Sequence, residues 1–161
     1  MRIIGIDPGL TKTGVGIIEV KNNSLSFVAC ETIYSDAAKP LAERLQHFHL
    51  VLTELIKKYQ PQQAAIEETF VNTNPVSSLK LGQARGALIL TLSLCNLPVF
   101  EYAATSIKKT VVGVGRADKN QIKAMVKILL PKAVFNSEDE ADALAIALCH
   151  NSHATFRKSY S

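Results

Sequence analysis

The sequence predicts an α/β fold in which a mixed five-stranded sheet carries helices on its faces. Three observations indicate this architecture. Short β-branched runs separated by turn residues open the chain, apolar residues then recur at helical spacing from residue 40, and strand-like and helix-like segments alternate from there onward. The length of 161 residues predicts a single domain, which we place over residues 1–155, and a flexible C-terminal tail over residues 156–161.

The first part of the chain is predicted to form an antiparallel meander of three strands. Residues 2–7 are a β-branched run that a Pro-Gly pair stops, and residues 14–20 are a second such run. An Asn-Asn pair supplies the next turn, and side chains alternate along a third strand over residues 25–34.

The remaining segments alternate between helix and strand. Apolar residues three and four positions apart predict a helix over residues 40–60. Capping boxes mark two later helix starts, at Asp118 with Gln121 and at Ser137 with Glu140. The other predicted segments are a strand over 64–68, a helix over 76–95, a strand over 99–102, a helix over 119–130 and a helix from 137 onward.

Composition excludes several classes of protein. The three cysteines are odd in number and far apart, which argues against a disulfide framework or a CxxC metal site. No signal peptide opens the sequence, and its most apolar run, residues 87–92, is too short to cross a bilayer. We therefore expect a soluble cytoplasmic protein without membrane association. The net charge of +4 permits a polyanionic partner without requiring one.

Acidic residues stand at strand ends and at the start of the last helix. Asp7 ends the first strand and Glu67 ends the fourth, so both emerge on one sheet edge if these strands are neighbours. Asp139 and Asp142 are three residues apart and share a helix face. Such a cluster of hard oxygen ligands suits Mg²⁺ or Mn²⁺, and a pair of these ions promotes phosphodiester hydrolysis.

Each of these carboxylates also has a purely structural interpretation. First-turn acidic residues such as Asp139 commonly complement the helix dipole, and Asp7 precedes a Pro-Gly turn. Glu67 and Glu68 point to opposite faces of their strand, and the pattern leaves open which one is a ligand. Asp142 lies beyond the first turn in an apolar run, where a charge needs a partner or a metal.

Five segments of the chain resemble the RuvC family of Holliday-junction resolvases. They follow the family's order and spacing and cover nearly the whole sequence: Gly5–Gly14, Ala65–Glu67, Leu79–Gly86, Pro98–Tyr102 and Glu140–Ala145. The resemblance implies an RNase H-like fold, with helices on both faces of a mixed five-stranded sheet. It also implies a homodimeric, Mg²⁺-dependent endonuclease that nicks two opposed strands of a four-way DNA junction.

The resemblance implies further details of the active site. The family's four acidic residues, which hold the metal and carry out catalysis, correspond to Asp7, Glu67, Asp139 and Asp142, which favours Glu67 over Glu68. We expect two Mg²⁺ ions, with Mn²⁺ able to substitute, and products with 5′-phosphate and 3′-hydroxyl ends. The family further implies a role in recombination and repair beside a RuvA and RuvB branch-migration complex.

Positive charge is concentrated over residues 105–132, where seven basic residues and one acidic residue give +6. Lys119, Lys123 and Lys127 recur every four residues opposite an apolar helix face. A row of one sign is typical either of a solvated surface or of phosphate contacts, and the absence of interspersed glutamates favours phosphate.

Other candidate DNA contacts come from the resemblance and from loop composition. Lys108 and Lys119 match basic positions that the family uses near the scissile phosphate. Arg116 follows two glycines in a loop able to track a DNA backbone. Phe70 matches a family aromatic near the junction centre and is predicted to stack on an unpaired base, with a core position as the alternative. With Lys123, these are the predicted DNA-binding residues.

Three other functions fit parts of the sequence. Asp7-x-Gly9 with the following threonines resembles the first phosphate loop of sugar kinases and actin-like ATPases, but these proteins use two lobes and no second loop is visible. A non-catalytic junction-binding protein predicts an incomplete acidic set, whereas all four positions are filled. YqgF-like nucleases share the fold and the early Asp, but residues 79–86 favour RuvC.

Two smaller patterns carry structural expectations. Gly82 and Gly86 form a GxxxG pair on a helix, which indicates close packing against the sheet or against a second subunit. His150 and His153, near the C-terminus, are expected to be surface residues rather than a metal pair.

Overall fold

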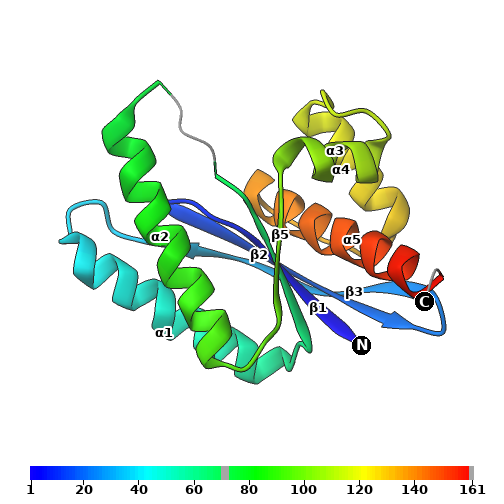
Figure 1. Ribbon diagram of the computed structural model, residues 1–161, viewed down its shortest axis with the longest axis horizontal. Coiled ribbons are helices and arrows are strands. Elements are labelled where there is room, and N and C mark those ends of the chain that lie inside the picture. Colours follow the sequence, from blue (N-terminus) through cyan, green and yellow to red (C-terminus); the bar gives the residue numbers. More distant parts are fainter. Residues whose placement is uncertain (70–72, 160–161) are drawn as a thin grey trace.

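The computed structural model describes residues 1–69 and 73–159 of the chain (Figure 1). The strands are β1 (Arg2–Asp7), β2 (Lys12–Lys21), β3 (Ser24–Tyr34), β4 (Gln63–Glu67) and β5 (Val99–Tyr102). The helices are α1 (Leu41–Tyr59), α2 (Pro75–Leu94), α3 (Ala104–Val112), α4 (Lys119–Leu129) and α5 (Glu138–Ser159). The described residues also contain no helix that is long and apolar enough to span a membrane.

The strands form one mixed sheet in the order β3-β2-β1-β4-β5. The first three strands pair antiparallel, whereas β4 runs parallel to β1 and β5 runs parallel to β4. The predicted meander and the mixed five-stranded sheet are therefore confirmed. In the parallel pair, Ile6 lies opposite Ile66, so the two strands end side by side.

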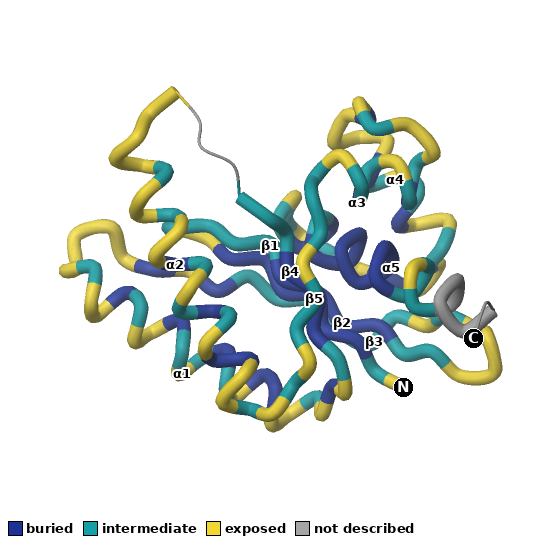
Figure 2. Tube along the Cα trace, in the orientation of Figure 1, coloured by how far each residue is buried: buried dark blue, intermediate teal, exposed yellow. Residues whose placement is uncertain are grey.

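Helices cover both faces of the sheet, as Figure 1 shows, with α1 and α2 on one side and α3, α4 and α5 on the other. Alternation along each strand divides its side chains between two cores. Ile4 and Ile6 of β1 belong to the core under α1 and α2, whereas Ile3 belongs to the core under α5. In Figure 2 the buried residues concentrate in β1, β2, β4 and the body of α5.

Helix α5 lies against the sheet backbone itself. A Cβ atom added at Gly5 of β1 would lie 2.1 Å from the carbonyl oxygen of Ala143, and one at Gly14 of β2 would lie 2.0 Å from that of Asp139. Any side chain at either position would collide with the helix backbone. Glycine on this face of β1 and β2 therefore sets how closely α5 approaches the sheet.

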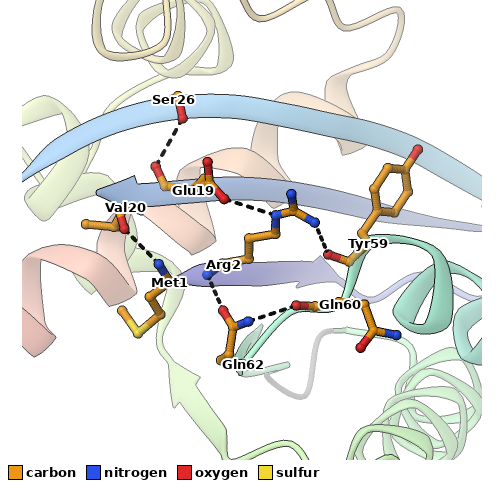
Figure 3. Close-up of polar contacts among 8 residues, drawn as sticks. All are labelled: Met1, Arg2, Glu19, Val20, Ser26, Tyr59, Gln60 and Gln62. Atoms are coloured by element: carbon orange, nitrogen blue, oxygen red, sulfur yellow. Dashed lines mark hydrogen bonds and ion pairs between the residues drawn. The ribbon is translucent and has the colours of Figure 1, made fainter. Parts of the chain in front are cut away.

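The N-terminal end of β1 is held by polar contacts with three neighbouring segments (Figure 3). The Arg2 guanidinium donates to the backbone carbonyl of Tyr59 at 2.7 Å and pairs with Glu19 of β2 at 3.2 Å. The Arg2 backbone N–H donates to the Gln62 side chain. These contacts bind β1 to β2, to the C-terminal end of α1 and to the connection between α1 and β4, which helps to set the register of β1 and β4.

Two helix predictions differ from the structure: one helix was missed, and one capping box is only half formed. Helix α3 was not predicted, because it has only nine residues, follows β5 directly and lacks a side-chain N-cap at Ala103. The capping box of Asp118 and Gln121 is confirmed, but that of Ser137 is half formed. Ser137 Oγ accepts from the N–H of Glu140 at 3.1 Å, whereas the Glu140 carboxylate accepts from the N–H of Asn136.

The C-terminal part of α5 also differs from expectation. The helix continues to Ser159, so helical backbone extends into the segment expected to be a tail. His150 was expected at the surface but is 2% exposed, because this part of α5 still lies over the sheet. Its ring lies 2.8 Å from Tyr102 Oη and 2.9 Å from Gln63 Oε1, which gives both ring nitrogens partners. His153 is exposed, as expected.

Candidate active site

Strand alternation places Asp7 and Glu67 on the sheet face that α5 covers. Gly5 and Asp7 lie two residues apart on β1, as do Ala65 and Glu67 on β4, and Gly5 and Ala65 both lie on the α5 side. Since β1 and β4 are parallel neighbours, the two carboxylates emerge at the same edge.

Helix α5 adds Asp139 and Asp142 to this edge. Its close approach at Gly14 brings the backbone of Asp139 against β2, at the end of the sheet where Asp7 pairs with Gly14. All four carboxylates line one cavity of about 300 Å³, and Lys108 of α3 and Lys119 of α4 line it as well. Elements from the whole length of the chain therefore contribute to one acidic cavity with two lysines in its wall.

Burial and mutual repulsion both act on the carboxylates. The pKa of Asp7 is raised to about 8, mainly because the group is buried and also because Glu67, Asp142 and Asp139 are close. The pKa of Glu67 is raised by burial and by the charge of Asp142, against an opposing effect of Lys108. Burial likewise raises the pKa of Asp142, although Lys119 opposes the shift.

The chemistry of these donors fits a hard divalent cation. Four carboxylates supply oxygen ligands only. A bound cation would offset the burial and the neighbouring negative charges that raise the pKa values of Asp7, Glu67 and Asp142. In the part of the chain that is described, no three His, Cys, Asp or Glu side chains are already gathered as a ligand set for one ion. Without a cation, like charges favour separation, so binding would draw the carboxylates of this cavity together.

The predicted basic residues occupy three different positions. Lys108 and Lys119 line the carboxylate cavity, whereas Lys123 lines a neighbouring one. Lys119 and Lys123 both form ion pairs with Glu138, at 2.6 Å and 3.0 Å. Arg116 is exposed in the connection between α3 and α4.

Lys127 departs from the row that it shares with Lys119 and Lys123 in the sequence. Its ammonium group donates to the carbonyl of Ala133 at 2.7 Å and lies over the ring of Phe135. The row therefore contributes two lysines to the region around Glu138 rather than three.

Two predictions concern the last residue of β4 and the residues that follow it. Glu67, and not Glu68, lines the carboxylate cavity. The backbone N–H of Glu68 continues the pairing with β5 by donating to Tyr102. Phe70 lies outside the described residues.

Arg85 is a site residue to which the sequence reasoning gave no role. Its Nε donates to the backbone carbonyl of Glu67 at 2.9 Å, and its guanidinium also pairs with Glu101 of β5. The side chain thereby ties α2 to the ends of β4 and β5, next to the Glu67 carboxylate. Arg85 lies in one of the family-like segments, but only the contact across the fold shows what it holds.

Comparisons with known proteins agree with this geometry. The family model described as "Crossover junction endodeoxyribonuclease RuvC" matches residues 3–150. A protein of that name from Xanthobacter autotrophicus is 54% identical over 153 residues, which cover 95% of this chain and 90% of the relative. A RuvC from Bartonella quintana is 50% identical over 161 residues, which cover 100% of this chain and 95% of the relative.

A solved structure supports the same relationship. The Thermus thermophilus RuvC in complex with Holliday junction substrate superimposes with a TM-score of 0.89 at 31% identity, covering 97% of this chain and 96% of that one. The expected RNase H-like fold is therefore confirmed. The chain belongs to the RuvC family of crossover junction endodeoxyribonucleases.

Proposed function

We propose that this protein is a structure-selective endonuclease that resolves four-way DNA junctions by nicking two opposed strands. The observation that supports this most directly is the single cavity lined by four carboxylates and two lysines in a chain of the RuvC family. The junction substrate bound to the Thermus thermophilus relative supports the choice of DNA structure. We place this activity in recombination and repair, in the cytoplasm, within one nuclease domain over residues 1–155.

Asp7, Glu67, Asp139 and Asp142 would hold Mg²⁺, with Mn²⁺ able to substitute, and two ions fit a set of four carboxylates. When bound, the ions supply an activated water and stabilise the departing oxygen. The carboxylates must be ionised to act as ligands. Loss of the proton is least favourable at Asp7, because its pKa is raised to about 8. We propose that cleavage leaves 5′-phosphate and 3′-hydroxyl ends, as the family resemblance implies.

Basic side chains position the DNA in this proposal. Lys108 and Lys119 in the cavity wall hold the phosphate that is cleaved, while Lys123 and Arg116 contact other parts of the backbone. Such contacts orient the strand without reading its bases. Phe70 is the proposed stacking residue at the junction centre.

Nicking two strands of one junction requires two active sites, and each chain has one, so we propose a homodimer. An exposed stripe on α2 supports this. Leu79, Leu90 and Leu94 are 66%, 59% and 63% exposed, and nothing lies within 4 Å of a Cβ added at Gly82 or Gly86. A helix face with apolar side chains and open glycines suits close packing against the same face of a second chain. Association with RuvA and RuvB is proposed from the family alone.

The proposed cleavage is tested with a synthetic four-way junction and a linear duplex of the same sequence in Mg²⁺. We expect nicking of the junction alone. Asp7→Asn should abolish nicking but leave junction binding, because a metal ligand is lost while the lysines remain. Asp36→Asn, at an exposed carboxylate that does not line the cavity, is the matched control and should cleave normally. Cleavage by the Asp7 variant would contradict the assignment.

A further inference from the structure

A second cavity, of about 430 Å³, lies beside the carboxylate cavity, and of its lining residues only Asp139 and Lys123 have been given a role so far. Asp139 lines both cavities, so the two are contiguous around this residue. Lys12, from the start of β2, and Lys123, from α4, provide its positive charge. Asn136 and Ser137, just before α5, and the apolar ring of Phe135 complete most of its wall.

The walls of this second cavity suit a phosphate group. Lys12 is exposed, and among the described residues it forms no ion pair; its ammonium group lies 5.9 Å from the centre of the Tyr34 ring. Asn136 adds a polar side chain. Ser137 Oγ, by contrast, already accepts from the Glu140 N–H and lies 2.9 Å from Thr32 Oγ1. The cavity also meets the N-terminal turn of α5, where backbone N–H groups and the helix dipole favour negative charge.

Two carboxylates in this wall, Glu138 and Asp139, oppose an anion, and Glu138 is the one that pairs with the lysines. Its carboxylate accepts from Lys119 at 2.6 Å and from Lys123 at 3.0 Å; Glu138 and Lys119 are exposed, and Lys123 is half-buried. Ion pairs at the protein surface are weak and screened by salt. A DNA phosphate carries the same charge as the carboxylate and brings further contacts, so it can displace Glu138 from Lys123.

Building on the proposed junction cleavage, we infer that this second cavity binds a backbone phosphate of the cleaved DNA strand, next to the phosphate in the carboxylate cavity. Lys12 and Lys123 are its cationic contacts, and Glu138 is the intramolecular competitor that occupies Lys123 in the absence of DNA. The site recognises the sugar-phosphate backbone and not the bases. The cavity reaches from Lys123 of α4 to Lys12 at the start of β2, with Asp139 in its wall.

The test measures junction binding in the Asp7→Asn background, in Mg²⁺ and at several salt concentrations, so that cleavage does not interfere. Lys12→Ala should weaken binding by about threefold to tenfold and should reduce the slope of log affinity against log salt by about 1. The control is Lys21→Ala, because Lys21 is an exposed lysine at the opposite end of the same strand. It should bind as the parent does.

The same assay tests Glu138. Glu138→Gln should bind more tightly than the parent, because Lys119 and Lys123 lose their intramolecular partner. Glu43→Gln, on α1, removes an exposed charge elsewhere and should leave affinity unchanged. Thermal unfolding of each variant verifies that the fold is intact.

The outcomes separate this inference from the proposed function. If the parent binds the junction and Lys12→Ala matches Lys21→Ala in affinity and slope, the second cavity is not a phosphate site. If Glu138→Gln binds no more tightly than the parent, the competition is refuted. If the parent shows no preference for four-way over linear DNA, the proposed function itself fails.

Discussion

The two faces of the central sheet are packed in opposite ways. Under α1 and α2, large side chains such as Phe48, Leu52 and Leu88 fill the space between helices and strands. Under α5, the buried residues of the helix alternate between alanines and larger side chains such as Leu144 and Ile146, but at the glycines of β1 and β2 the helix backbone lies against the strand backbone. Bulky side chains therefore set the spacing on one face, whereas direct backbone contact at glycines sets it on the other.

This difference explains where the active site lies. Large side chains adapt to one another, and a core built from them tolerates changes of shape when its volume is conserved. A backbone held against a backbone has no such freedom. The close contact at Gly14 fixes Asp139 relative to the ends of β1 and β2, so the precise placement of carboxylates belongs to the α5 face.

Of the changes that test this difference between the two faces, Gly14→Ala should have the largest effect on stability and cleavage. The added Cβ would lie 2.0 Å from the Asp139 carbonyl oxygen, so α5 must move. We expect a loss of about 3 kcal/mol or more in the free energy of unfolding, at the upper end for overpacked positions. Junction cleavage should be lost even where the protein remains folded, because Asp139 and Asp142 move with the helix. Chemical denaturation and the nicking assay measure the two effects.

Two controls show whether the effect is specific to the α5 face. Leu88→Ala, on the opposite face, should cost about 2–5 kcal/mol but leave cleavage intact at temperatures where the variant is folded. Gly115→Ala adds a Cβ at an ordinary 3.6 Å from the Thr105 carbonyl and should change little. Full activity in a folded Gly14 variant would show that the close contact does not position the carboxylates.

The next largest effect should be a rise in melting temperature on addition of Mg²⁺, and its size should depend on pH. The folded-state pKa of Asp7 is raised from 3.8 to about 8, so the folded protein binds this proton more tightly than the unfolded chain does. Without divalent cations, the stabilisation that the Asp7 proton gives the folded protein is complete below pH 3.8 and is lost as the pH rises toward 8. Mg²⁺ requires the ionised carboxylate and should therefore raise the melting temperature more at pH 8 than at pH 5.5.

Asp7→Asn provides the comparison for this measurement. Without metal at pH 8, the variant should melt several degrees above the wild type, because a buried charge facing three other carboxylates is gone. Its melting temperature should respond much less to Mg²⁺. An equal response to Mg²⁺ in both proteins would place the ion elsewhere.

The smallest effect on stability is expected at the outer surface of α2, on the other side of the sheet. Leu90→Asp changes a side chain that is 59% exposed, so the monomer should lose no more than about 0.5 kcal/mol. In the proposed dimer the same change buries a charge and should give monomers in sedimentation measurements. Lys80→Glu, an exposed change on the same helix, should leave the dimer intact. A dimeric Leu90 variant would move the interface away from the stripe.

The local pattern of the sequence was enough to predict most elements of the fold. Alternation identified the strands, helical spacing identified α1, and the Asp118 cap identified the start of α4. Helix α3 was missed because it is short and lacks a side-chain cap. His150 was misplaced because burial depends on what lies opposite a residue, which here is the sheet, and not on its distance from the chain end.

The sequence by itself determined which residue types stand at strand ends and on which face of its own element each one lies. That is local information, since the periods of strand and helix are properties of a single segment. Only the tertiary structure decided that Glu67 rather than Glu68 enters the cavity with Asp7, and that Arg85 holds the end of β4. The spacing of α5 from the sheet and the pairing of Glu138 with two lysines of α4 were also decided there. The physical reason is that these contacts join segments far apart in the chain, and their geometry depends on how whole elements pack.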